Sequence, residues 1–309
     1  KKIFRDVRKV CKYKYNSLHE PSFSNLEKEH LRKCIDSSYV STFGPEISKF
    51  EKNLNRFTNA KNSVAVINAT SGLFLSLKAL GINSSHEVLV PALTFIGTVN
   101  AISYTGATPH FIDVSKNFND IDYKQLEIYL DKITYKKKKN LINKKNNKII
   151  KCIIPVHLFG HPSDMEQCLY IAKKYKLKIV EDCAESLGSI FKKKHTGLYG
   201  DCGVISFNGN KIITTGGGGV ILTNSKKIAK KISHLASTSK VIKKFEITHD
   251  EIGYNFRLPN LNSALGVAQM KKLKIFVKLK RKLFYRYSLA LKNNPYVELM
   301  KEPKNCKSN

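Results

Sequence analysis

Short apolar runs alternate with amphipathic stretches along most of the chain. Where a helix is expected, apolar residues recur at helical spacing, as in Leu73, Leu77 and Leu80, and Gly81 then ends the stretch. The runs rich in β-branched residues predict strands at 63–67, 87–90, 109–114, 151–156, 177–182, 203–207 and 219–223. Because these strands alternate with helices, the pattern predicts an α/β fold with a largely parallel sheet.

Two capping boxes predict helix starts. Ser24 and Glu27 can satisfy each other's backbone donors, which predicts a helix from there to about Asp36. The segment Ser163-Asp164-Met165-Glu166 has the same form and predicts a helix to about Tyr175. Further helices are expected at 46–57, 95–103, 123–132, 260–274 and 278–291.

The stretch KKKKNLINKKNNK (136–148) interrupts this alternation. It is of low complexity and too charged to bury, so we expect a solvated surface insertion. It belongs to a wider excess of 54 Lys and Arg over 24 Asp and Glu, a net charge of +30. Such a charge favours nucleic acid or anionic membranes as partners. A non-catalytic, basic nucleic-acid-binding protein is therefore an alternative, although no RRM, zinc-finger or helix-turn-helix signature supports it.

The cysteines and the apolar segments exclude other classes. Seven widely spaced cysteines form no C-x-x-C pair, which argues against a zinc ribbon and favours a reducing, cytoplasmic compartment. Residues 88–112 carry no Asp, Glu, Lys or Arg, but prolines, Asn100 and Gly106 interrupt them, so they predict strand, helix and strand rather than a membrane helix. The first residue is not Met and no element signal closes the chain, so we expect a fragment at both ends.

Candidate chemistry follows several strand ends. Thr70 and Ser71 begin a helix, where they could bind an anion or serve as a plain cap. Asp182 ends a strand, where it could bind a metal, a ribose or a protonated ring nitrogen, or cap the next segment. Ser206 and Lys211 precede four glycines that match neither a Walker A loop nor a dinucleotide fingerprint. A desolvated lysine there suits Schiff-base chemistry, or it is one surface lysine among many.

The order of these features suits one cofactor. Pyridoxal phosphate needs a phosphate cradle, a ring-stacking face, a carboxylate for the pyridine nitrogen and a lysine for the aldehyde. Phe95, in PALTFIGT, supplies the candidate stacking face.

The motifs resemble those of the DegT/DnrJ/StrS family of sugar-nucleotide aminotransferases, which have the pyridoxal phosphate-dependent fold type I. The resemblance runs from about His19 to the end of the chain, and its stretches are VSTFGPEISKFE, INATSGLFLSL, VPALTFIGTVNAISYTGATPHFIDV, VHLFGHPSDM, VEDCAESLG, GDCGVISFNGNKIITTGGGGVILT and GYNFRLPNLNSALGVAQM. FNGNKIITTGGGG is most similar to the LegC-type branch, which makes 4-amino sugars on UDP-linked deoxyhexoses.

The resemblance implies three segments. A basic segment at 1–20 precedes a large cofactor-binding domain at 21–258, whose mainly parallel mixed sheet lies between helices. The beginning of a small C-terminal domain follows at 259–309. Because family members continue well beyond residue 309, we expect this small domain to be incomplete.

The resemblance also implies roles for single residues. Lys211 matches the catalytic Schiff-base lysine, and Asp182 matches the acid that pairs with the pyridine nitrogen. Phe95 matches the ring-stacking aromatic, and Glu185 stands where many members have Gln near the cofactor's phenolic oxygen. The matched phosphate ligands are Thr70, Ser71 and Ser206. Asn255 matches an asparagine that reaches the cofactor phosphate of a neighbouring subunit, which implies a homodimer with shared sites.

The implied reaction moves an amino group from glutamate to a nucleotide-linked 4-keto-6-deoxy sugar. The LegC-type resemblance implies a UDP-linked N-acetylated hexosulose for nonulosonic acid or surface glycan biosynthesis, with a GDP-perosamine-synthase-like reaction as the alternative. Lys211 stands where the sugar dehydratase branch has His. We expect neither a nucleic-acid nor a membrane partner. We expect no metal site either, since His157-x3-His161 lacks an evident third ligand.

Overall fold

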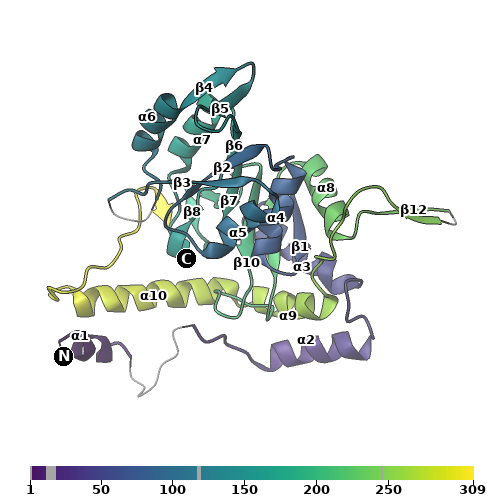
Figure 1. Ribbon diagram of the computed structural model, residues 1–309. Coiled ribbons are helices and arrows are strands. Elements are labelled where there is room, and N and C mark those ends of the chain that lie inside the picture. The colour runs from purple at the N-terminus through teal and green to yellow at the C-terminus, as the bar shows by residue number, and fades with distance from the viewer. Residues whose placement is uncertain (1, 12–18, 117–119, 245) are drawn as a thin grey trace.

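A mixed sheet forms the centre of the molecule (Figure 1). The computed structural model describes residues 2–11, 19–116, 120–244 and 246–309. The strand order is β1-β11-β10-β7-β6-β2-β3, with β5 beside β6 and β4 beside β5. Strands β10, β7, β6, β2 and β3 are parallel, while β11 is antiparallel to both its neighbours. The bounds are β1 (Asn62–Val66), β2 (His86–Pro91), β3 (Thr108–Ile112), β4 (Thr134–Lys137), β5 (Asn140–Asn143), β6 (Ile149–Ile153), β7 (Lys178–Asp182), β10 (Cys202–Ser206) and β11 (Gly219–Thr223).

Helices cover both faces of the sheet. One face packs against α4 (Ala69–Ala79), α5 (Ile96–Tyr104) and α8 (Lys226–Ala236). The other face packs against α3 (Pro45–Thr58) and α9 (Asn260–Met270) at one end, and against α6 (Tyr123–Ile133) and α7 (Met165–Tyr175) at the other. Successive strand residues alternate between these cores, as Val64 and Val66 do with Ala65. The predicted α/β fold with a mainly parallel sheet between helices is confirmed.

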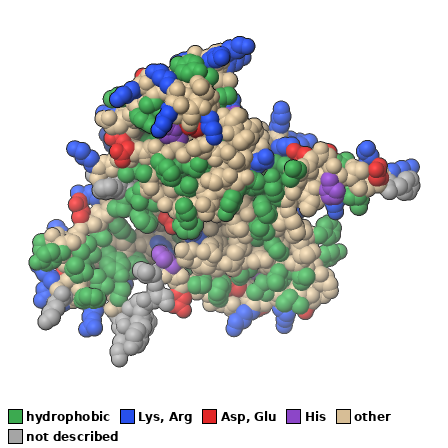
Figure 2. Space-filling model, viewed as in Figure 1, with side chains coloured by type: hydrophobic (Ala, Val, Ile, Leu, Met, Phe, Trp, Pro, Cys, Tyr) green, Lys and Arg blue, Asp and Glu red, His purple; other side chains and the backbone are tan. Residues whose placement is uncertain are grey.

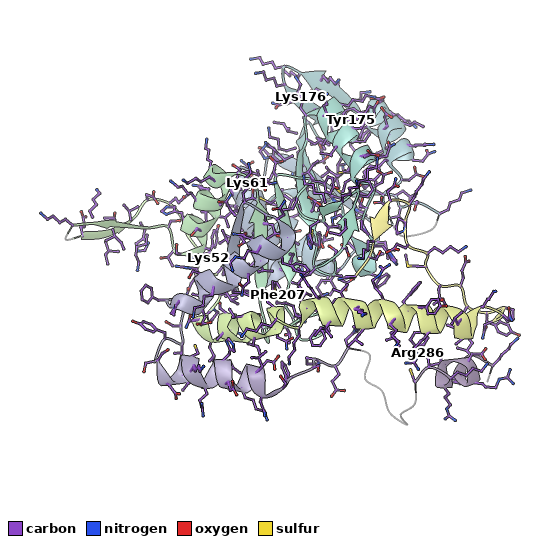
Figure 3. The ribbon with its side chains drawn as sticks, turned by 180° about the vertical axis from the view of Figure 1, so that it is seen from behind. Lys52, Lys61, Tyr175, Lys176, Phe207 and Arg286 are labelled. Carbon is purple, nitrogen blue, oxygen red and sulfur yellow. The ribbon has the colours of Figure 1, made fainter. Side chains whose placement is uncertain are left out.

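A long helical line runs along the base of the molecule. It consists of α9 and α10 (Leu273–Leu291), with α2 (Asn25–Asp36) beneath it (Figure 1). Figure 3 shows Phe207 between the sheet and this line. The Phe207 ring is fully buried and meets Phe50 of α3 edge-on, with 5.0 Å between ring centroids. Gly266 of α9 lies so close to Phe50 that a Cβ there would come 2.6 Å from the ring. These contacts fix the base under the loop that follows β10.

The remaining elements are short. They are α1 (Lys2–Arg8), the 3-10 turn η1 (Leu158–Gly160), a small sheet of β8 (Ile190–Phe191), β9 (Lys194–His195) and β14 (Cys306–Lys307), and a projecting hairpin of β12 (Lys240–Lys243) and β13 (Glu246–His249). The segment 88–112 forms β2, α5 and β3, as predicted. Within the described ranges no helix is both long and apolar enough to cross a membrane. Each of the seven cysteines is a free thiol.

Two expectations about local structure were wrong. The capping box at Ser24 is present, but α7 is capped by Asp164, which accepts from the N–H groups of Glu166 and Gln167. Ser163 is buried and bonds to Asp120 and to the Tyr123 hydroxyl instead. A tertiary contact thus takes the hydroxyl that the local pattern assigned to the cap.

The second expectation that was wrong concerns the lysine-rich stretch at 136–148. Instead of a solvated insertion, it forms the hairpin β4–β5, and β5 pairs with β6 of the main sheet. Leu141 and Ile142 are buried, while the lysines lie outside (Figure 2). Buried Glu87 accepts from the side-chain amides of Asn143 at 2.9 Å and Asn146 at 2.5 Å. Two apolar residues and two asparagines therefore suffice to attach a segment whose average charge predicts exposure.

Removal of the Leu141 side chain should therefore destabilise the protein. We expect Leu141→Ala to lower the free energy of unfolding by about 2–4 kcal/mol, because Leu141 is only 3% exposed and its loss leaves a cavity. Lys137→Ala, at an exposed position of β4, should change it by less than ~0.5 kcal/mol. Urea unfolding of both variants measures the difference. Equal stabilities would contradict the buried placement of β5.

Candidate active site

The candidate residues gather at the carboxyl ends of β7 and β10. Asp182 is the last residue of β7, and Ser206 is the last residue of β10. The two strands are parallel neighbours, with Val204 opposite Asp182. Because parallel strands end at the same edge of a sheet, both residues lie at that edge, where ligands of such sheets bind.

The Asp182 carboxyl group is buried and held in one orientation. The Thr98 hydroxyl donates to Oδ2 at 2.6 Å, and the Ala184 N–H donates to Oδ1 at 3.0 Å. Burial raises the pKa of Asp182, while these two hydrogen bonds and the nearby charge of Lys211 oppose that rise. Among the described residues no cationic group contacts this carboxylate directly, and a cation that enters the site would offset the cost of its burial.

Lys211 lies in the loop after β10 and faces Glu185. Its Nζ lies 3.0 Å from Glu185 Oε1, and Glu185 Oε2 accepts the Phe159 N–H at 2.9 Å. Lys211, Glu185, Ser206 and Phe159 line a cavity of about 250 Å³. Lys211 also lines a second cavity, of about 270 Å³, against α10. The amine is therefore reachable from two sides while its own side chain is only 17% exposed.

Thr70 and Phe95 lie on either side of Gly97. A Cβ at Gly97 would be 2.7 Å from Thr70 Oγ1 and 3.0 Å from atoms of the Phe95 ring. Ser71 follows Thr70 in the first turn of α4, where its N–H donates to the Asn68 side chain at 2.8 Å. Phe95 is 75% exposed, so the described residues leave most of its ring uncovered. Together these residues form a shallow cradle with hydroxyl groups on one side and an open aromatic ring on the other.

Seven of the eight predicted residues are thus connected through short steps. Phe95 caps α5, and Thr98 of α5 bonds to Asp182, whose pKa responds to Lys211. Asn255 is the exception, because it is exposed and none of these contacts involves it. It pairs in an isolated bridge with Ser237, near the base of the projecting hairpin.

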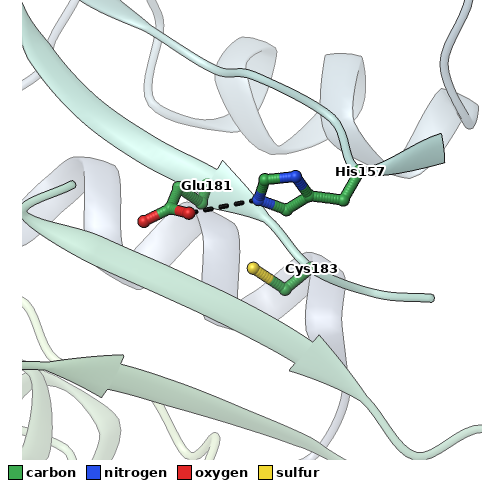
Figure 4. Close-up of side chains that lie close together, drawn as sticks. All are labelled: His157, Glu181 and Cys183. Carbon is green, nitrogen blue, oxygen red and sulfur yellow. Dashed lines mark hydrogen bonds and ion pairs between the residues drawn. The ribbon is translucent and has the colours of Figure 1, made fainter. Parts of the chain in front are cut away.

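His157 and His161 do not come together as metal ligands. The ring of His161 bonds to Ser308, whereas His157 Nδ1 accepts the Ser163 N–H and Nε2 lies 3.1 Å from Glu181 Oε2 (Figure 4). Glu181 and Cys183 lie close enough to His157 to form a three-ligand group. However, Glu181 also accepts the backbone N–H groups of three residues, Gly197, Tyr199 and Gly200. We interpret this buried cluster as the support of the strand end that carries Asp182.

The comparisons identify the family. The model of the DegT/DnrJ/EryC1/StrS aminotransferase family matches residues 21–309. The chain belongs to this family. It is 39% identical to the GDP-perosamine synthase of Escherichia coli O157:H7, over 94% of this chain and 75% of that protein. It is 33% identical to the putative pyridoxal phosphate-dependent aminotransferase EpsN of Bacillus subtilis, over 92% of this chain and 71% of that protein. A solved DegT DnrJ EryC1 StrS aminotransferase from Brucella abortus superposes with a TM-score of 0.83 at 27% identity, covering 92% of this chain and 73% of that one.

Membership makes the chain a sugar aminotransferase of fold type I with pyridoxal 5'-phosphate as its cofactor. The described residues fit this cofactor. The cradle at Gly97 would be filled by a single Cβ, and the open Phe95 ring offers a stacking face. Each Asp182 oxygen accepts one hydrogen bond from the chain, which leaves lone pairs for a pyridine N–H.

Filling the cradle should weaken cofactor binding. We expect Gly97→Ala to cost about 1–3 kcal/mol of binding free energy, which is about fivefold to 150-fold in Kd, because the new methyl group meets Thr70 and Phe95. Titration of the apo protein with pyridoxal phosphate, followed by absorbance, measures this. In Gly209→Ala the added Cβ meets nothing within 4 Å, so this control should bind as the wild type does. Equal affinities for Gly97→Ala and Gly209→Ala would contradict the cradle.

The motifs did not indicate Gly97, Thr98 or Phe159. Thr98 lies in the first turn of α5, and only the tertiary fold brings its hydroxyl to Asp182, 84 positions later in the chain. Phe159 lies in the matched stretch VHLFGHPSDM, but no local pattern predicts its left-handed backbone, with φ at +52°. Gly97 and Thr98 follow the candidate stacking residue Phe95 by two and three positions, and this closeness in sequence could have indicated them.

Proposed function

We propose that the chain transfers the amino group of glutamate to the keto carbon of a nucleotide-linked 4-keto-6-deoxy sugar, for surface glycan or nonulosonic acid biosynthesis. The observation that carries this proposal is the placement of the Lys211 amine. It lies in the cavity at the open end of the sheet, beside Glu185 and close to buried Asp182. The family supports the amino transfer and the sugar.

Lys211 would carry out the proton transfers. When bound, the cofactor supplies an aldehyde for amines and a ring that stores the electron pair left on the substrate carbon. Lys211 Nζ would take up the proton that leaves the α-carbon of glutamate. In the second half of the reaction it would deliver a proton to C4 of the sugar. Glu185 would orient the amine between these steps, because its other oxygen is fixed by the Phe159 N–H.

Asp182, Phe95 and the hydroxyl groups would hold the cofactor in place. The Asp182 carboxylate would face the pyridine nitrogen and keep it protonated, with Thr98 preventing rotation of the carboxyl group. Phe95 would cover one face of the ring. The phosphate would lie against Thr70, Ser71 and Ser206, near the N-terminal end of α4, where the helix dipole favours an anion.

Asn255 would act across a homodimer. It is exposed, and none of the contacts that join the other candidate residues within one subunit involves it. An exposed asparagine at this place suits contact with the cofactor phosphate bound by a second copy of the chain.

The proposed domain division has three parts. A basic segment at 1–20 precedes a large cofactor-binding domain at 21–258, and the beginning of a small domain follows at 259–309.

The surroundings of Lys211 suit a substrate whose sugar carries a charged nucleoside diphosphate. Lys280 of α10 and His19 line both cavities. These two groups would bind a diphosphate. The name of the Escherichia coli relative supports a GDP-linked sugar. The LegC-type resemblance supports a UDP-linked N-acetylated hexosulose as the second candidate.

The proposed function is tested by comparing the two candidate nucleotide sugars as amino acceptors. The purified protein with pyridoxal phosphate and glutamate is incubated with GDP- and UDP-linked 4-keto-6-deoxy sugars. Formation of 2-oxoglutarate and the mass of the nucleotide sugar are followed. Amination of one sugar at a rate at least tenfold above the other assigns the nucleotide. The proposed substrate class would be wrong if the cofactor-loaded protein converts glutamate to 2-oxoglutarate but aminates neither sugar.

A further inference from the structure

We propose that Phe159 is a specificity-determining residue, whose ring forms the apolar wall against which the substrate's sugar packs. This inference rests on the proposed function and names a contact within the same site. Four observations carry it: the backbone conformation of Phe159, the hydrogen bonds that hold it, the exposure of the residue, and the cavity that it lines.

The backbone of Phe159 is in a disfavoured conformation. Its φ and ψ are +52° and 25°, in the left-handed region that suits glycine and asparagine. It is the only aromatic residue among the described non-glycine residues with positive φ. Such conformations persist where the surroundings enforce them, and they concentrate at ligand sites. A phenylalanine is a poor choice here for folding alone.

Hydrogen bonds on both sides of the turn enforce this conformation. The Phe159 N–H donates to Glu185 Oε2 at 2.9 Å. The next carbonyl, of Gly160, accepts the hydroxyl of buried Ser189 at 2.6 Å. Glu185 also holds the Lys211 amine. One carboxylate therefore fixes the ring-bearing turn relative to the reacting amine.

The ring itself has no packing role in the described structure. It is 65% exposed, although it follows buried His157 by two residues. It lines the cavity around Lys211 together with Ala184, Leu187 and Ile212, which make part of this wall apolar. Glutamate presents two carboxylates and only two methylene groups, so it gains less from an aromatic wall than a deoxy sugar does. The C–H face and methyl group of a 6-deoxy sugar gain from its contact, because both surfaces leave water.

The test compares Phe159→Asn with Phe159→Tyr. Asparagine tolerates the left-handed conformation, so Phe159→Asn should raise the melting temperature while it removes the wall. We expect its Kd for the aminated nucleotide sugar to rise about tenfold, measured by calorimetry on protein loaded with pyridoxamine phosphate, with which an amine does not react. The KM for glutamate in the half-reaction should stay within twofold. Phe159→Tyr keeps the ring and should bind as the wild type does.

The control is Tyr296→Asn, which removes an aromatic ring that is 75% exposed and lines neither cavity. It should change neither constant. The proposal is overturned if Phe159→Asn changes sugar binding by less than twofold, or if the KM for glutamate rises as much as the Kd for the sugar. If the wild type binds a nucleotide sugar but does not aminate its keto form, and Phe159→Asn weakens that binding, the proposed reaction is wrong while the role of Phe159 is supported. If the wild type binds no nucleotide sugar, both fail.

Discussion

Lys211→Ala is expected to abolish amino transfer, with a fall in kcat of at least about 10³-fold, since general acid–base catalysis by one group and the covalent attachment of the cofactor are lost together. Lys211→Arg should fail equally. It keeps the positive charge beside Glu185, but a guanidinium group neither releases its proton nor reacts as an amine. The pair of variants thus separates the need for a charge from the need for a reactive amine.

Borohydride reduction gives the readout that does not depend on turnover. In the wild type it should fix the cofactor to the peptide that contains Lys211, as mass spectrometry will show. Lys230→Ala, at an exposed position of α8, is the matched control and should behave as the wild type does. A Lys211→Ala protein that still carries covalently fixed cofactor after reduction would exclude Lys211 as the attachment point.

Asp182→Asn is expected to lower kcat by about 10²-fold or more, because a neutral amide cannot keep the pyridine nitrogen protonated. The shape of the site should survive. The introduced amide can accept the Ala184 N–H with its oxygen and donate its N–H₂ to the Thr98 hydroxyl. That hydroxyl can then donate to Thr94 Oγ1, which lies 3.0 Å away. The loss would therefore report the charge rather than a distorted fold.

The same variant should make the apo protein more stable at neutral pH. Burial raises the pKa of Asp182 in the folded state, so the folded state binds more protons than the unfolded chain above the ordinary Asp range. The wild type therefore loses stability as the pH rises through that range and up to the folded pKa. Asparagine does not titrate in this way. The difference in free energy of unfolding between Asp182→Asn and the wild type should therefore grow with pH and then level off.

Urea unfolding of the apo proteins at several pH values measures this advantage. Asp36→Asn, at an exposed position at the end of α2, should show no comparable pH dependence. A variant that is less stable than the wild type at every pH would contradict the stated environment of Asp182. A variant that retains full kcat would contradict its role opposite the pyridine nitrogen.

The elements that the sequence predicted well are those with a strong local signal. The strands at 203–207 and 219–223 and the helix that starts after Ser24 depend on apolar runs and a capping box, both of which act within a few residues. The prediction failed where a distant partner took over. Ser163 bonds to Asp120 rather than capping α7, and the lysine-rich hairpin is attached through Leu141 and Glu87.

The sequence by itself determined the class of fold, the family and the candidate residues Asp182 and Lys211, because alternation of apolar runs and the order of motifs are properties of a linear chain. Only the tertiary structure decided what surrounds them. It brought Thr98 to Asp182, Gly97 between Thr70 and Phe95, and the turn at Phe159 onto Glu185. Contacts of this kind join residues from separate helices and loops, and their geometry follows from packing across the whole sheet rather than from any local pattern.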